Sequence, residues 1–395
     1  MKKNNMINHL QKGWLALLIL FCGLFANTAM AQETFTWTGA TSTDWAETTN
    51  WTQSAPGVGD DYPGQTLSNA TVTIVPTAGF APTAMTGTYT ITRLNVNNAT
   101  GFEAGATLTI PSGANITVSG SAGGLITLAG GKIINNGSLT VVTSSTSATA
   151  AFSCTLPSAL PLEPTTYGYE GSGDLTVNVS TVTTTNTAAI GVQAALNANT
   201  TYQFLFNGTT NFSLGTTNSF ALRNFGGGVG AAALIVGGTG FTHGTVDTPK
   251  RGGVLSCISG GSLTVNSGTT INMVSLSTNT CAAMIVLGNS TATPTVFTNN
   301  GTINLSGTTT TRGIDTSTFT SPAATVDRII TFNNYGTINV NVNATGTLAN
   351  LSSAWAVGTG TATNSLARVT VNNYGTFSLT NTSTSGAGNA ISVNT

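Results

Sequence analysis

The sequence predicts an all-β fold, a right-handed parallel β-helix (solenoid) with three short strands per coil. Three observations lead to this prediction: a polar but almost uncharged composition, segments that repeat at a nearly constant spacing, and Asn–Gly corners between strand-like runs. Only 6% of the 395 residues are charged, against about 25% in typical soluble proteins. Surface helices need such charges on their exposed faces, and regular bursts of Val, Ile, Leu and Phe argue against disorder.

The first 31 residues have the organisation of a secretion signal. A basic start is followed by an apolar run of 13 residues (14–26) and by the small-residue cleavage pattern AMA at 29–31. The apolar run is shorter than the roughly 20 residues of a membrane-spanning helix. The sequence therefore predicts a signal peptide over 1–31, cleaved on export, and a secreted or cell-surface chain with no membrane span.

The charge balance after this leader excludes several classes of partner. Three of the 11 Lys and Arg residues lie in the leader, so eight basic residues face 12 acidic ones, a formal charge of −4. No basic patch is available to follow phosphates, so nucleic acid is not an expected partner. His243 is the one histidine left, which rules out a zinc site built on several histidines. No metal and no cofactor are expected.

Four segments in the second half begin alike and predict stacked coils. They start at glycines 33, 35 and 39 residues apart and read GTTINM, GTINL, GTINV and GTFSL: Gly268, Gly301, Gly336 and Gly375. A second strand-like patch follows the start (282–287, 353–357 and 389–393), and a third precedes the next start (295–298, 328–332 and 368–371). Three short strands per repeat, joined by polar corners, are typical of a parallel β-helix.

Asn and Gly mark the same corner of successive repeats. The corner reads NNG at 299–301, NNYG at 333–336 and NNYG at 372–375, with an early copy, NNG, at 135–137. Both residue types tolerate the left-handed backbone of a sharp corner, and stacked amides hydrogen-bond along the stack. We expect Asn ladders and a stacked pair of Tyr335 and Tyr374, with a sugar-binding aromatic pair as the alternative.

Weaker copies of the repeat extend the solenoid toward the N-terminus. They begin near residues 137, 173, 208 and 261. We expect an N-terminal β cap and first coils over 32–100, followed by one continuous β-helix over 101–395. Longer loops are expected at 143–170, where three prolines argue against strands, and at 237–253.

Three tryptophans lie close together after the leader, in the segment FTWTGATSTDWAETTNWT at 35–52. This segment resembles the W-T-G-x-T-S-T-D-W opening of secreted, repeat-rich surface proteins of Bacteroidetes-type bacteria. The later coils resemble right-handed parallel β-helix adhesins and autotransporter-like passengers. The resemblance implies export and display but no single chemistry, since such scaffolds also include polysaccharide lyases and hydrolases. We expect the tryptophans to close the N-terminal end of the solenoid, with a carbohydrate platform of Trp37 or Trp51 as the alternative.

The resemblance also raises an expectation about the C-terminus. Members of this group commonly end in a sorting domain, whereas this sequence stops in the second strand of a repeat, at Thr395. An open solenoid end needs a cap. We therefore expect a β-helix truncated in mid-repeat, with a missing C-terminal domain, or a last coil that meets a partner.

Acidic residues are the candidates for an enzymatic alternative. Polysaccharide-degrading enzymes need paired or clustered carboxylates, or acids with a base. Asp315 and Asp327, with Arg312 and Arg328, lie in one repeat and its loop, and Asp60 lies in a Pro- and Gly-rich stretch. We expect surface ion pairs and a solvated or capping aspartate, so the chain is predicted not to be an enzyme. A catalytic role for Asp315, Asp327 and Asp60 is the alternative.

Three cysteines remain after the leader: Cys154, Cys257 and Cys281. They allow at most one intramolecular disulfide. Cys257 and Cys281 are 24 residues apart, close to one repeat, and export permits a disulfide. The sequence suggests a Cys257–Cys281 bond as a hypothesis.

The predicted function is that of an exported structural or adhesive module. Thr, Ser and Asn on the outside of a solenoid form arrays of hydroxyls and amides, suited to many weak hydrogen bonds with extracellular glycans or surface proteins. The low charge predicts binding that depends weakly on salt. The alternative is a polysaccharide-degrading enzyme, a lyase or glycoside hydrolase, on a pectate-lyase-like β-helix, which requires clustered buried acids.

Overall fold

The fold is described from a computed structural model. It describes residues 32–54, 60–66, 68–76, 79–99, 104–147, 149–157, 160–161, 163, 165–184, 187–193, 200–226, 233–244, 251–275, 281–289, 293–319, 328–344, 353–358, 367–383 and 389–394. The segment Thr34–Thr395 forms one compact unit. The leader predicted over 1–31 lies outside the described residues.

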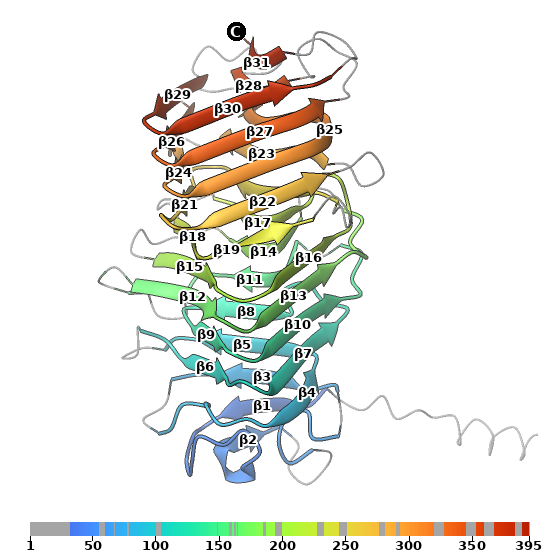
Figure 1. The fold of residues 1–395 in the computed structure, drawn as a ribbon. Helices are drawn as coiled ribbons and strands as arrows, with labels where there is room; N and C mark the ends of the chain where they lie inside the picture. The colour runs from blue at the N-terminus through green and yellow to red at the C-terminus, as the bar shows by residue number, and fades with distance from the viewer. Residues whose placement is uncertain are drawn as a thin grey trace, which may run out of the picture. The chain divides into compact units, whose positions relative to one another are not determined.

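Successive strands of the chain fall on three parallel faces, which turn the segment into a β-helix (Figure 1). Face 1 consists of β4 (Gly87–Ile91), β7 (Ala114–Gly120), β10 (Ser138–Thr143), β13 (Asp174–Val179), β16 (Thr210–Leu214), β19 (Gly240–His243), β22 (Thr270–Ser275), the first half of β25 (Thr302–Phe319), β27 (Thr337–Ala344) and β30 (Thr376–Asn381). The pairing is parallel and in register along this face from β4 to β16 and from β19 to β30.

Faces 2 and 3 complete each coil. Face 2 consists of β1 (Thr34–Trp37), β3 (Thr71–Ile74), β5 (Arg93–Asn97), β8 (Ile126–Ala129), β11 (Ala150–Cys154), β14 (Ala188–Val192), β17 (Phe220–Asn224), β20 (Gly253–Cys257), β23 (Cys281–Asn289), the second half of β25, β28 (Ser353–Gly358) and β31 (Asn389–Asn394). Face 3 consists of β6 (Thr107–Ile110), β9 (Lys132–Asn135), β12 (Thr165–Gly171), β15 (Thr200–Phe206), β18 (Ala233–Gly238), β21 (Ser262–Val265), β24 (Thr295–Asn299), β26 (Arg328–Asn334) and β29 (Ala367–Asn373).

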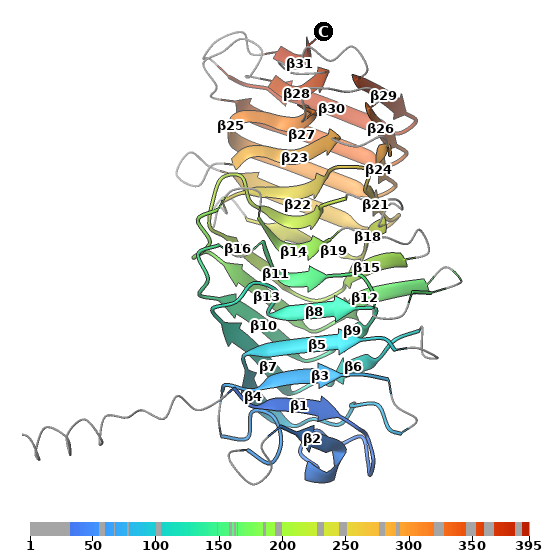
Figure 2. The same cartoon turned by 180° about the vertical axis from the view of Figure 1, so that it is seen from behind.

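The coils turn in the right-handed sense. In Figure 1 the strands of face 1 lie nearest the viewer and run from left to right while the chain climbs from blue to red. Figure 2 shows the opposite side, where the strands of face 2 also run from left to right. A rising path with this direction in both views is a right-handed helix, so the predicted fold class and the three strands per repeat are confirmed.

Side chains on faces 1 and 3 alternate between the core and the solvent. The burial pattern of β27 places Ile338 and Val340 in the core and Thr337 and Asn339 outside, as the two-residue period of a strand requires. Inward residues of successive coils meet, and the rings of Phe297 and Phe332 have centroids 5.0 Å apart. Each fully buried apolar side chain contributes about 1.5–3 kcal/mol, and the inward residues form one continuous core.

Face 2 buries both sides of its central strands. Every residue of β11, β14, β17 and β20 is buried, and these strands are rich in Ala, Gly and Ser. Strands buried on both sides lack polar and apolar alternation. For this reason the loops predicted at 143–170 and 237–253 are wrong in part: β11 lies inside the first range and β19 inside the second.

Candidate functional site

The N-terminal end of the solenoid is closed by a tryptophan cap, which consists of Trp37, Trp45 and Trp51. β2 (Trp51–Gln53) pairs antiparallel with β1, and a 3₁₀ turn, η1 (Thr48–Asn50), precedes it. The ring of Trp51 contacts those of Trp37 and Trp45 edge-on, with both centroid distances 4.8 Å. All three rings are buried. The cap therefore leaves Trp51 no ring face for a sugar, in agreement with the expected closing role.

Each indole N–H in the cap is satisfied by a backbone carbonyl. Nε1 of Trp37 donates to the carbonyl of Phe80 at 2.7 Å, that of Trp45 to Pro63 at 3.0 Å, and that of Trp51 to the carbonyl of Trp45 at 2.8 Å. Buried Trp N–H groups usually find such partners. The polar atoms of the cap are thus engaged within the chain itself.

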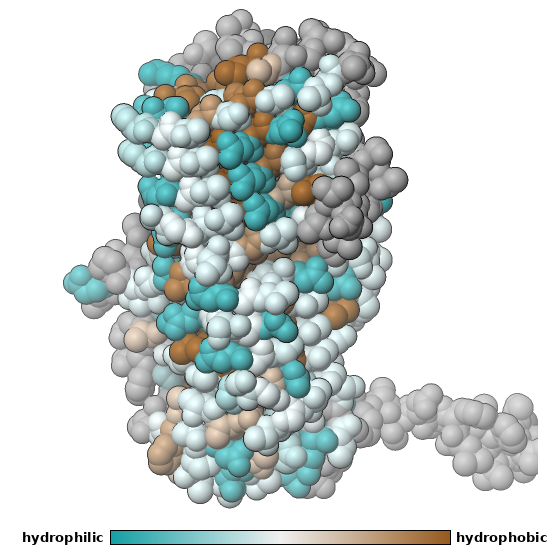
Figure 3. Space-filling model, in the orientation of Figure 1, coloured by the Kyte–Doolittle hydropathy of each residue, from teal (hydrophilic) through white to brown (hydrophobic). Residues whose placement is uncertain are grey.

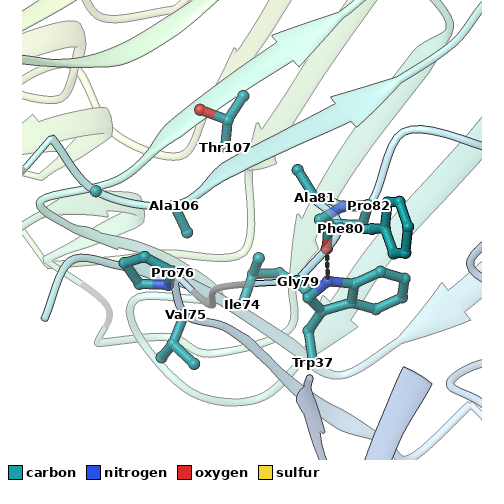
Figure 4. A pocket seen from close by; sticks show the side chains of 11 residues that line it. Trp37, Ile74, Val75, Pro76, Gly79, Phe80, Ala81, Pro82, Ala106 and Thr107 are labelled. Atoms are coloured by element: carbon teal, nitrogen blue, oxygen red, sulfur yellow. Dashed lines mark hydrogen bonds between the residues drawn. The ribbon is translucent and has the colours of Figure 1, made fainter. Parts of the chain in front are cut away.

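A small hollow lies beside Trp37 (Figure 4). Its volume is about 240 Å³, below the roughly 300–1,000 Å³ of typical ligand pockets. The lining is mainly apolar: Trp37, Ile74, Val75, Pro76, Gly79, Phe80, Ala81, Pro82, Gly105, Ala106 and Thr107. Specific small-molecule sites combine an apolar lining with several placed polar groups. Thr107 is the one polar side chain here, so the hollow gives little support to the alternative of a sugar site at Trp37.

Face 1 carries a regular polar surface. In its last coils Thr270, Thr302, Thr337 and Thr376 occupy one register position, and neighbouring strands lie about 4.8 Å apart. In the earlier coils Thr90, Thr117, Thr140 and Thr176 form a similar column. We call the outward residues of the face 1 strands the face 1 array. Among the described residues of the face 1 array, Asp174 is the one that carries a charge.

A ladder of amides runs beside the threonines of the face 1 array. Nδ2 of Asn339 donates to Oδ1 of Asn304 at 2.9 Å, and Nδ2 of Asn304 donates to Oδ1 of Asn272 at 2.8 Å. These three residues, the Asn column, continue to Thr242 at 3.4 Å. Hydrophilic side chains follow one another over β22, β25 and β27 in Figure 3. The ladder fixes the amides, so their remaining groups are presented to the solvent in a repeated orientation.

The Asn column was not predicted from the sequence. Its members stand at the fourth or fifth position of the repeat starts, in GTTIN and GTIN, where the shared letters indicate stacked coils but not a ligand surface. The two-residue strand period was the available signal, because it places Asn272, Asn304 and Asn339 outside whenever the intervening Ile lies inside.

The predicted ladders at the Asn corner are present. Nδ2 of Asn299 donates to Oδ1 of Asn334 at 2.9 Å, and Nδ2 of Asn334 donates to Oδ1 of Asn373 at 2.8 Å. A second, outer ladder joins Asn372 to Asn333 at 2.9 Å. Buried polar groups need such partners, and the inner ladder supplies them in every one of these coils.

Tyr335 and Tyr374 stack on each other at this corner. Their ring centroids are 5.0 Å apart with an interplanar angle of 10°, and the side chains are 54% and 70% exposed. The facing sides of the two rings are therefore occupied by the stack. A sugar needs a free ring face, and the stack occupies one face of each ring, so the two rings cannot enclose a sugar between them.

The candidate acids are not brought together. Asp60 is buried near the N-terminal end, where its carboxylate accepts a hydrogen bond from the backbone N–H of Thr66 at 3.0 Å. Along face 2, β3 and β25 are eight strand spacings apart, or roughly 38 Å at ~4.8 Å each. Paired glycosidase carboxyls lie only about 5–10 Å apart. Asp60 and Asp315 therefore cannot form a catalytic pair, and Asp327 lies outside the described residues.

Asp315 forms an ion pair, as expected, but not at the surface. Its Oδ2 lies 2.6 Å from Nη1 of Arg312, and both side chains are largely buried. The pair is on the second half of β25, in face 2, where both sides of the strands are covered. The expectation of an exposed pair is wrong because face 2 is not an open surface.

The hypothesis of a Cys257–Cys281 disulfide is wrong. Cys257 lies opposite Leu287 in the register of β20 and β23. Cys281 stands six residues before Leu287, or about 20 Å along the strand, whereas disulfide-bonded residues have Cα atoms within about 7 Å. Cys154 and Cys257 are buried free thiols, and burial raises the pKa of both.

Among the described residues, no three His, Cys, Asp or Glu side chains are grouped closely enough to hold a metal ion. Within those residues, too, no helix is long and apolar enough to span a bilayer.

Comparison of the chain with protein-family models, with curated proteins and with solved structures gave no match. The fold and the face 1 array therefore carry the functional argument by themselves.

Proposed function

We propose that this chain is an exported structural or adhesive β-helix module that binds neutral, hydroxyl-rich glycans through the face 1 array. The observation that carries the proposal is the in-register array itself, with Thr and Asn side chains repeated at the strand spacing. Glycan hydroxyls both donate and accept hydrogen bonds, as do the Thr hydroxyls and Asn amides. Export and surface display belong to the same proposal and are supported by the leader pattern and by the resemblance of residues 35–52.

Preorganisation supports the Asn column as the centre of the binding surface. Each amide in it is held by its neighbours at 2.8–2.9 Å, so little side-chain freedom is lost when a ligand binds. Ordering a flexible side chain at an interface costs about 0.5–1.5 kcal/mol. A fixed ladder avoids much of that cost at every coil.

The enzymatic alternative has less support. A hydrolase needs two carboxyls within about 10 Å, and the described candidates, Asp60 and Asp315, are far apart. Asp315 is also engaged by Arg312. The adhesive function is therefore the one that the geometry favours.

The proposal is tested with residues 32–395 and a panel of neutral and acidic polysaccharides. Retention is measured at low and high salt, with and without calcium, and the length of each polysaccharide is followed. We expect retention on at least one neutral polysaccharide, changing less than about twofold with salt because few charges take part, and no shortening. Shortening would make the chain an enzyme, and strongly salt-dependent or absent binding would also reject the proposal.

A pair of Thr→Val variants locates the binding surface. Thr302→Val removes one hydroxyl from the face 1 array, and Thr331→Val removes one from face 3, where the side chain has comparable partial exposure. Each hydrogen bond contributes about 0.5–1.5 kcal/mol, so we expect T302V to weaken binding about fivefold. T331V is expected to leave it unchanged. Equal effects on both faces would place the glycan elsewhere.

A further inference from the structure

Face 1 is divided into two stretches of sheet. β4, β7, β10, β13 and β16 form a sheet of their own, whereas β19, β22, the first half of β25, β27 and β30 belong to another sheet. Where the two stretches meet, the rings of Phe212 in β16 and Phe241 in β19 pack edge-on with centroids 5.3 Å apart. The face 1 array therefore falls into two parts of five strands each. We call the outward residues of the second part the β19–β30 array.

The β19–β30 array is uncharged and contains no aromatic ring among its described residues, whereas the earlier part includes Asp174. Hydroxyl groups that leave water need hydrogen-bond partners. The array therefore suits the hydroxyl-bearing edge of a neutral sugar chain rather than the apolar face of its rings. Its outward side chains are those of Thr, Asn, Ser and Val: Thr242, Thr270, Asn272, Val274, Thr302, Asn304, Ser306, Thr337, Asn339, Asn341, Thr376, Ser378 and Thr380.

Like groups in the β19–β30 array repeat across the strands and not along them. Along β22 the outward residues change from Thr270 to Asn272 to Val274, at steps of about 6.8 Å. Across the strands, about 4.8 Å apart, two polar columns run over the same coils, as the hydrophilic side chains in Figure 3 show. A polymer with a short constant repeat matches the columns, so it lies along the solenoid axis. One column is Thr270, Thr302, Thr337 and Thr376, and the other is Thr242, the Asn column and Ser378.

The amides of the Asn column retain groups for a ligand after the ladder has formed. Asn304 donates through Nδ2 to Asn272 and accepts at Oδ1 from Asn339. An amide has two N–H donors and two acceptor lone pairs, so one of each is left on this partly exposed side chain. Successive units of an extended β-1,4-linked chain are turned over relative to one another. An amide that offers both a donor and an acceptor suits either orientation of a sugar hydroxyl.

We propose that the β19–β30 array binds a linear, extended, β-1,4-linked neutral polysaccharide, edge-on and along the solenoid axis. This inference rests on the proposed glycan-binding function and specifies its ligand class. A sugar unit of such a chain is nearly as long as one strand spacing of ~4.8 Å, so successive units meet successive coils. Five strands span four spacings, or roughly 19 Å, which accommodates about five units. An α-1,4-linked chain of the same sugar coils and leaves the columns after a few units.

Two series of glucose oligosaccharides test the linkage and the length. Cello-oligosaccharides (β-1,4) and malto-oligosaccharides (α-1,4) of two to six units are titrated into residues 32–395 by calorimetry. Each added β-1,4-linked unit up to the fifth is expected to tighten binding about threefold, and the sixth less than twofold, because hydrogen bonds are added until the array ends. Maltohexaose is expected to bind at least tenfold more weakly than cellohexaose. Equal binding of the two hexaoses, or an affinity independent of length, overturns the proposal.

A pair of Asn→Leu variants places the ligand on the β19–β30 array. Asn304→Leu removes the central amide of the Asn column. Asn333→Leu is the matched control on face 3, because Asn333 is also partly exposed and belongs to the outer ladder, where it accepts from Asn372 at 2.9 Å. We expect N304L to weaken cellohexaose binding at least fivefold and N333L to leave it unchanged, with folding checked by thermal unfolding. Equal effects of the two substitutions would reject the assigned surface.

The ends of the Asn column test the direction of the chain. Asn272 and Asn339 are two strand spacings apart, or roughly 10 Å, so a chain that follows one strand contacts only one of them. We expect Asn272→Leu and Asn339→Leu each to weaken cellohexaose binding at least threefold. An effect of only one of the two variants would mean that the chain follows a strand, contrary to the proposal.

The polysaccharide panel described for the proposed function separates the two proposals. Retention on neutral polysaccharides with no preference for extended β-1,4-linked chains would overturn the ligand class and leave glycan binding in place. Absence of retention on every member of the panel would reject both.

Discussion

Asn50 shows at the scale of one residue how the N-terminal motif acts. Its side chain is fully buried, and Oδ1 accepts hydrogen bonds from the backbone N–H groups of Thr41 and Ser42 at 2.9 and 3.1 Å. Nδ2 donates to the carbonyl of Asp44 at 2.9 Å. One amide therefore fixes the turn between Trp37 and Trp45, which explains why the motif combines small polar residues with tryptophans.

The buried thiols give the first prediction at the residue scale. Cys154 and Cys257 are fully buried and their pKa values are raised by burial, and the thiolate is the reactive form. In a Cys281→Ser variant of residues 32–395, we expect no reaction with a thiol reagent at pH 8 in the folded state. Two thiols should react in denaturant. Reaction in the folded state would contradict the burial of the two thiols. If no thiol reacts in denaturant without reductant, Cys154 and Cys257 are not free thiols.

At the scale of the strand, the strands that could be predicted from the sequence are those whose polar and apolar residues alternate with a two-residue period. Strands β22, β27 and β30 begin with TIN, TIN and TFS and alternate between polar and apolar residues, so one side was recognisable as core. β11 reads AAFSC and is buried on both sides, so its pattern resembles a loop rich in small residues. Its burial depends on face 2 being covered, which no local pattern indicates.

The candidate site was predictable where residues recur at one position. The Tyr335 and Tyr374 stack followed from two copies of NNYG, and the inner Asn ladder followed from the same corner. The disulfide was not predictable, because a spacing near one repeat does not give the register. Cys257 ends β20 and Cys281 begins β23, which separates them along the coil although they lie on neighbouring strands.

The inner Asn ladder gives a prediction at the element scale. Asn334 is fully buried, accepts from Asn299, and donates to Asn373 at 2.8 Å and to the carbonyl of Thr376 at 3.0 Å. Asn334→Leu leaves these partners without a hydrogen bond, and each such buried group costs about 1–3 kcal/mol. We expect the free energy of unfolding to fall by about 2–4 kcal/mol, measured by urea titration.

The matched control lies in the Asn column of face 1. Asn304 also bridges two coils, but its side chain is partly exposed, so water replaces the lost hydrogen bonds. Asn304→Leu is expected to cost less than about 1 kcal/mol. A loss as large as that of N334L would mean that exposure does not decide the contribution of an Asn ladder in this fold.

For the whole molecule, the charge distribution predicts how stability depends on pH. Burial raises the pKa of Tyr169 from 10.0 to about 12 and also raises the pKa of Tyr202, Cys154 and Cys257. A raised pKa in an acidic group means that the folded state retains its proton longer than the unfolded state. The resulting stability is complete below the unfolded pKa and is lost as the pH rises toward the folded pKa.

Arg223 acts in the opposite direction. Burial lowers its pKa from 12.5 to about 10, so the folded state releases a proton first and gains stability as the pH rises above 10. The gain in stability from this one guanidinium at high pH is set against the losses from two phenols and two thiols. Two pKa units for Tyr169 alone correspond to roughly 2.7 kcal/mol, so the acidic groups decide the sign of the net effect.

We therefore expect the free energy of unfolding to fall by several kcal/mol between pH 9 and pH 11, measured by urea titration at fixed ionic strength. Tyr169→Phe removes one of the responsible groups and should make this fall smaller by about 1.4 kcal/mol, because pH 11 lies about one unit above the unfolded pKa of 10.0 and below the folded pKa of about 12. Tyr335→Phe is the control, because its ring lies at the exposed corner, and it should leave the slope unchanged. An alkaline slope that is the same in Y169F and in the unaltered chain would show that the buried phenol of Tyr169 does not control the stability at high pH.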